Sequence, residues 1–272
     1  MTIRIRRIDG RETDALTYLA QAPYDNVFLT YLLLDSAVRA RGSISIAIDT
    51  RDRIRGVVYF GRQIVLACDD AALDATAALA RSFRGERMIV GPYDTVRGYW
   101  ERVRAWHAPP RLVRERQPVM AIDRARLRSC ERATIVRRAR IDEWTSVADN
   151  SAAMIAQELD YDPRRSSPEF AINVRAMIDR GLWWVGESLG RLCFYCNIGP
   201  WSTQTTQLQG IWTPPEMRGR GLAAASLAAI CDRLLEGSPT LSLYVNDFNR
   251  PAIALYERVG FERVGAFQTL LF

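Results

Sequence analysis

A glycine-rich turn between an apolar strand and an alanine-rich helix constrains this chain more than any other segment. The apolar run of residues 206–213 predicts a strand, the turn reads Arg-Gly-Arg-Gly over residues 218–221, and a helical pattern begins at Leu222. The N-terminus of a helix leaves about four N–H groups unpaired and carries roughly half a positive charge. Small residues in the turn let an anion approach these groups closely. The segment therefore predicts an α/β fold with a phosphate-binding turn.

This turn differs from two well-known phosphate-binding motifs. It lacks the lysine and the G-x-x-x-x-G-K-[ST] spacing of a P-loop, and it is not a G-x-G-x-x-G motif with an acidic residue about 20 positions later. Taken alone, the turn is also compatible with a plain loop that leads into a helix. A second motif is needed to decide between these interpretations.

That second motif lies downstream of the turn. It has the pattern N-x-x-A-x-x-x-Y-x-x-x-G-F, present as Asn249, Ala252, Tyr256, Gly260 and Phe261. Together with R-x-x-G-x-A at residues 218–223, it resembles the GNAT superfamily of N-acetyltransferases. The resemblance covers about residues 134–272. The whole chain further resembles a bacterial GNAT subfamily with an extra N-terminal domain of unassigned function.

The resemblance implies that acetyl-CoA is the co-substrate, and it indicates which residues bind it. The backbone groups expected to pair with the pantetheine arm, as an added strand does, belong to Ile211, Trp212 and Thr213. The backbone amides expected to hold the pyrophosphate belong to Gly219, Arg220, Gly221, Leu222 and Ala223. Arg218 and Arg220 are expected to add charge near the phosphates. Asn249 is expected both to contact the cofactor and to cap the following helix.

The same resemblance implies that Tyr256 donates a proton to the departing thiolate. Tyr256 lies two helical turns after Asn249, and an unperturbed phenol pKa of about 10 suits this proton transfer. Taken alone, an aromatic residue at helical spacing is more often part of a core. Many family members carry a glutamate five residues before the asparagine, where this chain has Tyr244. The general base is therefore open between Glu158, Asp247 and ordered water.

Two segments with the same order of elements flank a polar, arginine-rich stretch at residues 123–132. Each begins with a strand, continues with two helical stretches and then returns to strands. We therefore expect two tandem GNAT-like domains of mixed-sheet α/β (α+β) fold, residues 1–125 and residues 133–272. The first domain lacks both motifs and is expected to be a degenerate partner that covers the acceptor pocket at the domain junction.

Hydrophobic periodicity gives the expected elements of both segments. In the first, strands are expected at 3–8, 44–48, 56–60, 64–67 and 88–90 and helices at 12–20, 26–38, 71–80 and 95–104. In the second, strands are expected at 134–141, 182–187, 191–198, 206–213, 240–245 and 261–272 and helices at 143–158, 168–180, 222–235 and 251–259. The three strands between residues 182 and 213 are expected to form an antiparallel meander.

Composition argues against several other kinds of chemistry. All 37 basic residues are arginine, which excludes catalytic lysines and Schiff bases, and the net charge of +6 is weak evidence for an anionic ligand. Cys193 and Cys196 form a C-x-x-C, but an alternating strand points them to opposite faces, so neither a metal nor a redox site is expected. His107 is the single histidine and lies in an expected loop. Five scattered cysteines, without a secretory signal or a long apolar run, predict a reduced cytoplasmic protein that does not enter membranes.

The sequence leaves several functional questions open. A non-catalytic acyl-CoA-binding sensor is the alternative to an acyltransferase, because the family glutamate is missing. A nucleic-acid surface would account for ten arginines at residues 111–140, but acids interrupt them and no aromatic residue interleaves, so a linker is favoured. The acceptor is expected to be a small-molecule or peptide amine bound by the helices of residues 143–180. Trp183 and Trp184 either line that pocket or pack in the core, and a homodimer stays open.

Overall fold

The computed structural model describes residues 2–35, 43–83, 86–130, 134–167 and 169–272. The elements of the N-terminal half are β1 (Arg4–Arg7), α1 (Glu12–Leu19), α2 (Pro23–Leu34), β2 (Ser43–Ile48), β3 (Ile54–Phe60), β4 (Gln63–Cys68), α4 (Asp70–Ala80), β5 (Met88–Pro92), α5 (Tyr93–Val103) and β6 (Leu112–Asp123). Those of the C-terminal half are β7 (Ile135–Arg138), η1 (Ile141–Glu143), α6 (Trp144–Leu159), α7 (Pro163–Ser166), α8 (Glu169–Asp179), β8 (Trp183–Ser188), β9 (Arg191–Trp201), β10 (Thr206–Trp212), η2 (Pro215–Met217), α9 (Leu222–Leu234), β11 (Thr240–Tyr244), α10 (Arg250–Val259) and β12 (Glu262–Leu271).

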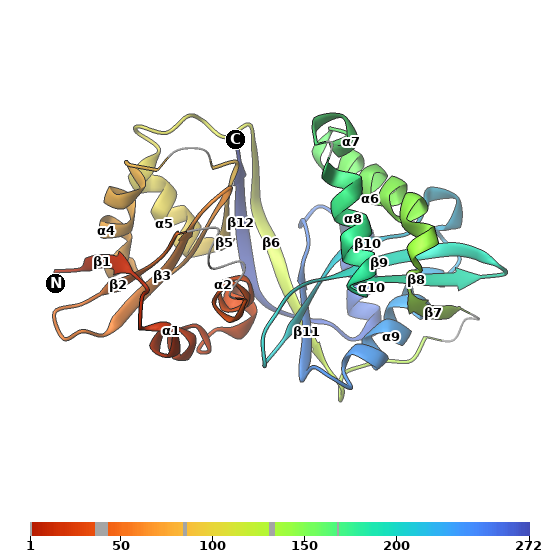
Figure 1. The fold of residues 1–272 in the computed structure, drawn as a ribbon. Coiled ribbons are helices and arrows are strands. Elements are labelled where there is room, and N and C mark those ends of the chain that lie inside the picture. Colours follow the sequence, from red (N-terminus) through yellow and green to blue (C-terminus); the bar gives the residue numbers. More distant parts are fainter. Residues whose placement is uncertain (1, 36–42, 84–85, 131–133, 168) are drawn as a thin grey trace.

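All twelve of these strands belong to one sheet, in the order β1-β2-β3-β4-β5-β12-β6-β11-β10-β9-β8-β7. Most neighbours are antiparallel, whereas β4 with β5 and β10 with β11 are parallel. The N-terminal strands lie on one side and the C-terminal strands on the other, with β12 and β6 side by side between them (Figure 1). The expected mixed-sheet α/β fold is therefore confirmed.

Helices cover both faces of the sheet in each half. In the N-terminal half, α1 and α2 pack on one face and α4 and α5 on the other, as the membership of two separate apolar clusters shows. In the C-terminal half, α9 and α10 pack on one face while α6 and α8 pack on the other. This arrangement explains why β4, β5, β8 and β9 contain continuous apolar runs, because a strand buried on both faces has no polar side.

The two halves exchange strands at the centre of the sheet. β6, which precedes the arginine-rich stretch, pairs with β11 through Met120 opposite Leu243, and β12 at the C-terminal end of the chain pairs with β5 through Leu270 opposite Ile89. The expectation of a linker over residues 111–140 is wrong for this strand, which is a central member of the sheet. The division of the chain into residues 1–125 and 133–272 stays a prediction.

The expected local elements agree with the structure except at a few places. The hairpin of β2 and β3 and the meander of β8, β9 and β10 are confirmed. A helix was expected at residues 26–38, whereas α2 begins at Pro23 and ends at Leu34, because the backbone of Asp35 is extended. Residues 36–38 of the expected helix lie outside the described residues. A short additional helix, α7, precedes α8, with the Asp162 side chain accepting a hydrogen bond from the Arg164 amide at its start.

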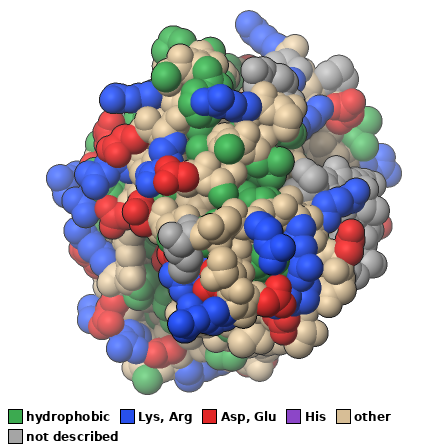
Figure 2. Space-filling model, turned by 90° about the vertical axis from the view of Figure 1, so that its left-hand side faces the viewer, with side chains coloured by type: hydrophobic (Ala, Val, Ile, Leu, Met, Phe, Trp, Pro, Cys, Tyr) green, Lys and Arg blue, Asp and Glu red, His purple; other side chains and the backbone are tan. Residues whose placement is uncertain are grey.

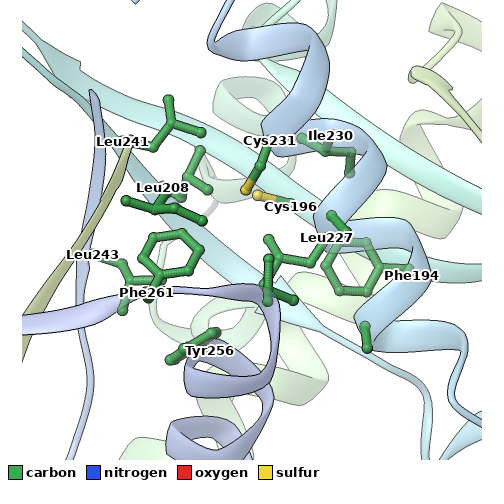
Figure 3. Close-up of a cluster of buried hydrophobic side chains, with 14 of the residues drawn as sticks. Phe194, Cys196, Leu208, Leu227, Ile230, Cys231, Leu241, Leu243, Tyr256 and Phe261 are labelled. Carbon is green, nitrogen blue, oxygen red and sulfur yellow. The ribbon is translucent and has the colours of Figure 1, made fainter. Parts of the chain in front are cut away.

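The core of the C-terminal half lies between its strands and the helices α9 and α10. Phe194 and Leu208 from the sheet meet Leu227 of α9 and the ring of Phe261 that follows α10 (Figure 3). Such aromatic and aliphatic side chains contribute about 1.5 to 3 kcal/mol each when they are fully buried. The core therefore fixes α9 and α10 relative to the strands between which the candidate site is built.

The two thiols of the C-x-x-C segment lie in this same core. Cys193 lies beside Ser226 of α9, and Cys196 lies near Cys231 on the same helix. Both thiols therefore face α9, and the expectation that they point to opposite faces of the sheet is wrong. The reason is a register shift between β8 and β9, because Gly186 pairs with Phe194 while the next residue pairs with Leu192, which leaves Cys193 as an extra residue. All five cysteines of the chain are free.

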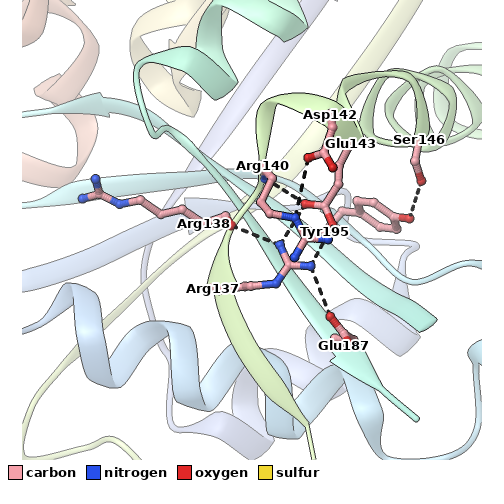
Figure 4. Close-up of polar contacts among 8 residues, drawn as sticks. All are labelled: Arg137, Arg138, Arg140, Asp142, Glu143, Ser146, Glu187 and Tyr195. Atoms are coloured by element: carbon pink, nitrogen blue, oxygen red, sulfur yellow. Dashed lines mark hydrogen bonds and ion pairs between the residues drawn. The ribbon is translucent and has the colours of Figure 1, made fainter. Parts of the chain in front are cut away.

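Ion pairs within the chain engage arginines of the stretch between residues 111 and 140. Arg137 binds Glu143 at 2.7 Å and Glu187 at 3.1 Å, which ties β7 to β8 and to η1 (Figure 4). Arg126 binds Glu262 at 2.8 Å, and Arg124 pairs with Asp232. Intramolecular partners therefore account for these arginines without a polyanion.

Charged side chains of both signs are mixed on the surface of the N-terminal half. Figure 2 shows arginine side chains interspersed with acidic ones on this face. In the same half, Arg102 bridges Asp70 and Asp74 between α5 and α4. No helix within the described part of the chain is long and apolar enough to cross a membrane.

Candidate active site

Strands β10 and β11 separate from each other partway along their length. They are paired only at Thr206 opposite Leu241 and at Gln207 opposite Ser242. On its other side, β10 stays paired with β9 as far as Trp212. Within the described residues, the edge of β10 that faces β11 therefore has no partner strand from about residue 209 onward. Backbone N–H and C=O groups at such an edge can bind an extended ligand as an added strand.

A bulge at Gly210 shapes this open edge. The register between β10 and β9 shifts between Gln209 and Trp212, and Gly210 has a φ of +60°. A Cβ at this position would clash with the side-chain oxygen of Asn197 and lie 3.2 Å from the ring of Trp183. Glycine avoids both the strained φ and this clash. A lone glycine in a strand pattern can signal such a bulge, although the sequence interpretation did not use it.

The glycine turn after η2 presents unpaired backbone amides at the start of α9. Gly219 and Gly221 have φ values of +75° and +76°, in the left-handed region that favours glycine, and α9 begins at Leu222. No backbone carbonyl of a described residue accepts from the amides of residues 219–223, whereas the Ala225 amide donates to the Gly221 carbonyl. The turn therefore has the geometry of an anion-binding helix N-terminus.

The two arginines of the turn have different surroundings. The Arg218 Nε donates to the Thr213 carbonyl at 3.0 Å, and its Nη2 donates to the Gln157 side chain at 3.2 Å. Its guanidinium carbon lies 4.5 Å from the centroid of the Trp212 ring. Arg220 is exposed and has no partner among the described residues. Arg218 therefore ties the turn to β10 and α6, while Arg220 is available to a ligand.

Helix α10 places the second motif opposite this turn. The Asn249 side chain accepts from the Ala252 amide at 3.3 Å, so its expected role as the cap of this helix is confirmed. Tyr256 lies two turns later, only 6% exposed, with its ring 5.9 Å from that of Phe261. Burial raises the pKa of Tyr256 above its ordinary value. The phenol is therefore protonated at neutral pH, and its role as proton donor stays a prediction.

The predicted site residues converge on one groove of about 280 Å³, called here the cofactor groove. With the exception of Asp247, the catalytic and cofactor-binding residues proposed from the sequence line it, namely Glu158, Ile211, Trp212, Thr213, Arg218, Gly219, Arg220, Gly221, Leu222, Ala223, Asn249 and Tyr256. These residues come from the end of α6, the open edge of β10, the glycine turn and α10. The structure therefore brings together residues that are nearly 100 positions apart in the sequence.

A second cavity of about 640 Å³, called here the central cavity, adjoins the cofactor groove. The residues that line both spaces are Glu158, Ile211, Asn249, Ala252 and Tyr256. The cavity lies between α6 and α8 on one side and the separated strands on the other. Trp183 lines it, whereas Trp184 is buried in the core. Tyr256 and Glu158 therefore lie where a ligand in the groove meets a ligand in the cavity.

Of the two carboxylates considered as a base, only Glu158 lies at this junction. Asp247 is exposed and lines neither space. Glu158 is accessible from the cavity, and the surrounding protein raises its pKa by desolvation, an effect that the positive charge of Arg114 partly offsets. A carboxylate with a raised pKa is a better proton acceptor than an ordinary surface glutamate.

Strand β6 contributes residues that the sequence interpretation missed. The Arg114 Nη2 donates to the backbone carbonyl of Glu158 at 2.5 Å, and its guanidinium carbon lies 4.8 Å from the centroid of the Phe248 ring. Gln117 lines the central cavity, and its side chain donates to the Asn246 side chain at 3.0 Å. No signal in the local sequence could assign them, because β6 itself was not predicted.

A third cavity of about 330 Å³, called here the outer cavity, lies between the two halves. It shares four residues with the central cavity, namely Gln63, Met177, Gln209 and Tyr244. Tyr244, at the position of the family glutamate, has its ring 5.3 Å from that of Phe267 on β12. The three spaces are therefore neighbours with shared walls, from the glycine turn to the junction between the halves.

Two family models match the chain. Residues 140–261 match the acetyltransferase (GNAT) family, and residues 45–147 match a domain of unknown function (DUF4081). A mycothiol acetyltransferase of Acidimicrobium ferrooxidans is 31% identical over 125 residues. That alignment covers 44% of this chain and 39% of the relative, so it spans well under half of that protein.

Solved structures of similar fold span the whole chain. A Drosophila protein superposes with a TM-score of 0.69 at 13% identity, covering 98% of both chains. A tandem GNAT protein from the clavulanic acid biosynthesis pathway has a TM-score of 0.56 at 14% identity, covering 99% of this chain and 98% of its own. The family models assign residues 140–261 to the acetyltransferase (GNAT) family, and the DUF4081 match at residues 45–147 lies N-terminal to it.

Proposed function

We propose that the protein transfers an acetyl group from acetyl-CoA directly to a primary amine. The observation that carries this proposal is the junction at Tyr256 and Glu158, where a groove with unpaired backbone groups meets a cavity large enough for a second substrate. Each half of the reaction has its own space, and the two spaces touch at one proton donor and one proton acceptor. Such an arrangement favours direct attack over a covalent intermediate on the protein.

The cofactor groove suits the three parts of CoA. The open edge of β10 at residues 211–213 offers backbone groups to the two amides of pantetheine. The free amides of residues 219–223 and the positive end of α9 offer donors to the pyrophosphate. Arg220 adds charge from the rim, while Arg218 holds the turn in place through Thr213. Asn249 stays on the groove wall as the cap of α10.

The chemistry needs one proton removed and one supplied. The acceptor nitrogen forms a bond to the acetyl carbonyl carbon, and Glu158 takes the proton that this nitrogen loses. The bond between that carbon and the CoA sulfur then breaks, and Tyr256 gives its proton to the sulfur before solvent restores it. General acid and base groups of this kind contribute about 10² to 10⁴-fold each.

The walls of the central cavity indicate the chemical class of the acceptor, whereas the named relative matches only part of this chain. The name of that relative, mycothiol acetyltransferase, supports acetyl transfer as the reaction type. The cavity walls combine neutral side-chain amides, among them Asn173, Asn197 and Gln209, with the indole of Trp183. These walls suit a polar small-molecule amine or the end of a peptide.

The proposal is tested by mixing the purified full-length chain with acetyl-CoA and a broad panel of primary amines while measuring free thiol. We expect thiol release that depends on the amine, with Tyr256→Phe lowering kcat by about 10² or more while leaving CoA affinity unchanged, since general acid catalysis has this magnitude. Binding of CoA without turnover for any amine would instead support a sensor. Absence of both binding and turnover would overturn the proposal.

A further inference from the structure

The outer cavity is lined by aromatic rings from both halves of the chain. Tyr31 of α2 and Trp201 at the end of β9 have ring centroids 4.6 Å apart, and Tyr244 and Phe267 have centroids 5.3 Å apart. Phe28 of α2 completes this wall. The faces of aromatic rings carry partial negative charge and attract cations. A cavity lined in this way favours a positively charged group over an anion.

A single carboxylate faces the same cavity. Asp25, in the first turn of α2, is half-buried, and neither an ion pair nor a hydrogen bond engages its carboxylate within the described residues. Its Oδ1 would lie 3.4 Å from a Cβ added at Gly265, so it packs close to β12. Desolvation raises the pKa of Asp25, and no neighbouring positive charge opposes this effect. A partly buried carboxylate without a partner is stabilised when a cation binds beside it.

Two simpler interpretations of Asp25 are weaker. An acidic residue in the first turn interacts favourably with the helix dipole, but that interaction does not require an aromatic cavity beside it. Arg180 also lines the outer cavity, yet it is exposed, forms no ion pair with Asp25 and lies over none of the rings. The cation that fits this cavity therefore comes from a ligand.

The outer cavity adjoins the central cavity, in which the acceptor is proposed to bind. It shares Gln63, Met177, Gln209 and Tyr244 with the central cavity. Among the described residues that line the central cavity, Glu158 alone carries a formal charge. A ligand that spans both spaces would thus meet Glu158 at one end and Asp25 at the other, with Arg180 as the one further charged residue among the described lining of the two cavities.

We propose that the outer cavity binds a second cationic group of the acceptor, so that the substrate is a diamine or polyamine. This inference rests on the proposed function, because the first amine of the acceptor is the one acetylated beside Tyr256. In this arrangement the N-terminal half supplies Asp25, Phe28 and Tyr31 and acts as a specificity-determining partner.

The first experiment measures binding without turnover. Calorimetry on the CoA-loaded full-length protein uses α,ω-diamines of increasing length and the amino alcohols of equal length, in which a hydroxyl replaces the second amine. We expect the diamine of optimal length to bind about tenfold more tightly than its amino alcohol, on the scale of one charge-assisted hydrogen bond. Asp25→Asn should abolish this preference. Asp94→Asn, which removes an acid from the first turn of α5 outside all three spaces, should retain it.

The second experiment measures kcat/KM for the same pairs with acetyl-CoA. The preference should appear in KM and vanish in Asp25→Asn, whereas Asp94→Asn should keep both the preference and the kcat of the wild type. Equal binding of diamine and amino alcohol at every length, or a preference that survives in a folded Asp25→Asn protein, would overturn the inference. Diamine binding that depends on Asp25 without thiol release would instead leave this site standing and refute the transferase. Turnover of amino alcohols with no diamine preference would instead support the transferase and refute the cation site in the outer cavity.

Discussion

Replacing Gly221 by valine should nearly abolish CoA binding. Gly221 has a φ of +76° at the start of α9, where a side chain with a Cβ costs about 1 to 2 kcal/mol and a β-branched one more. The strained turn is expected to relax in the free protein, so that the amides of residues 219–223 point away from the pyrophosphate site. Binding of CoA must then restore about 1 to 3 kcal/mol of strain, which corresponds to a loss of affinity of roughly 5- to 150-fold.

Comparison with Arg220→Ala separates backbone from side-chain binding. Arg220 is exposed, so its removal should cost no more than about 1 kcal/mol of binding energy, which is less than the effect of Gly221→Val. Gly10→Val is the matched control, since Gly10 has a φ of +78° with nothing within 4 Å of an added Cβ and lies far from the groove. It should lose similar stability in urea unfolding and retain CoA affinity.

Calorimetric titration with CoA at constant salt checks this order. The reasoning is refuted if Arg220→Ala weakens CoA binding more than Gly221→Val does in a folded protein. Side-chain charge, and not the backbone of the turn, would then hold the phosphates.

Three further predictions concern other parts of the site and of the fold. Arg114→Met removes a positive charge that lowers the pKa of Glu158, so the acidic limb of the kcat/KM profile should move to higher pH; an unmoved limb would exclude Glu158 as the base. Gly210→Ala combines a φ of +60° with a steric clash and should cost about 2 to 5 kcal/mol of folding free energy, lowering Tm by several degrees in scanning calorimetry. The Arg137 guanidinium lowers the pKa of Glu143, so the ion pair stabilises the fold above the unfolded pKa of about 4.3. Glu143→Gln should therefore lower the free energy of unfolding in urea at pH 7. The difference in this free energy between the variant and the wild type should fade as the pH falls through the pKa of Glu143 in the folded protein.

The two motifs were readable in the sequence because each is local. The glycine turn has its meaning in the strand before it and the helix after it, and Tyr256 follows Asn249 on one helix. Each segment therefore predicts its own geometry, and the core under α9 and α10 brings the two together. Glu158 was a weaker prediction, because its position at the end of α6 places it in the groove only through tertiary packing.

Strand β6 could not be predicted, for two physical reasons. Pro118 and charged residues interrupt its alternation, and a proline argues against a central strand because it cannot donate to a neighbour. The structure tolerates Pro118 through its carbonyl, which accepts from the Val245 amide. Its partners, moreover, are β11 and β12, more than 100 residues away, and no local pattern reveals a pairing at that distance.

The roles of Arg114 and Asp25 were hidden for the same reason. Both belong to the half of the chain that lacks the motifs, and both reach the neighbouring cavities only because β12 and β6 join the halves into one sheet. Local patterning can assign residues to elements, but it cannot say which half of a two-part protein contributes to a shared site.

The most direct test of the account is a crystal structure of the full-length protein with CoA. We expect the pyrophosphate oxygens within about 3 Å of the amides of residues 219–223, the usual length of an N–H···O hydrogen bond. The pantetheine arm should run along the open edge of β10, with its sulfur beside the Tyr256 hydroxyl. CoA bound elsewhere on the chain, or held by side chains with these amides unoccupied, would contradict the claim that the separated strands and the glycine turn form the cofactor site.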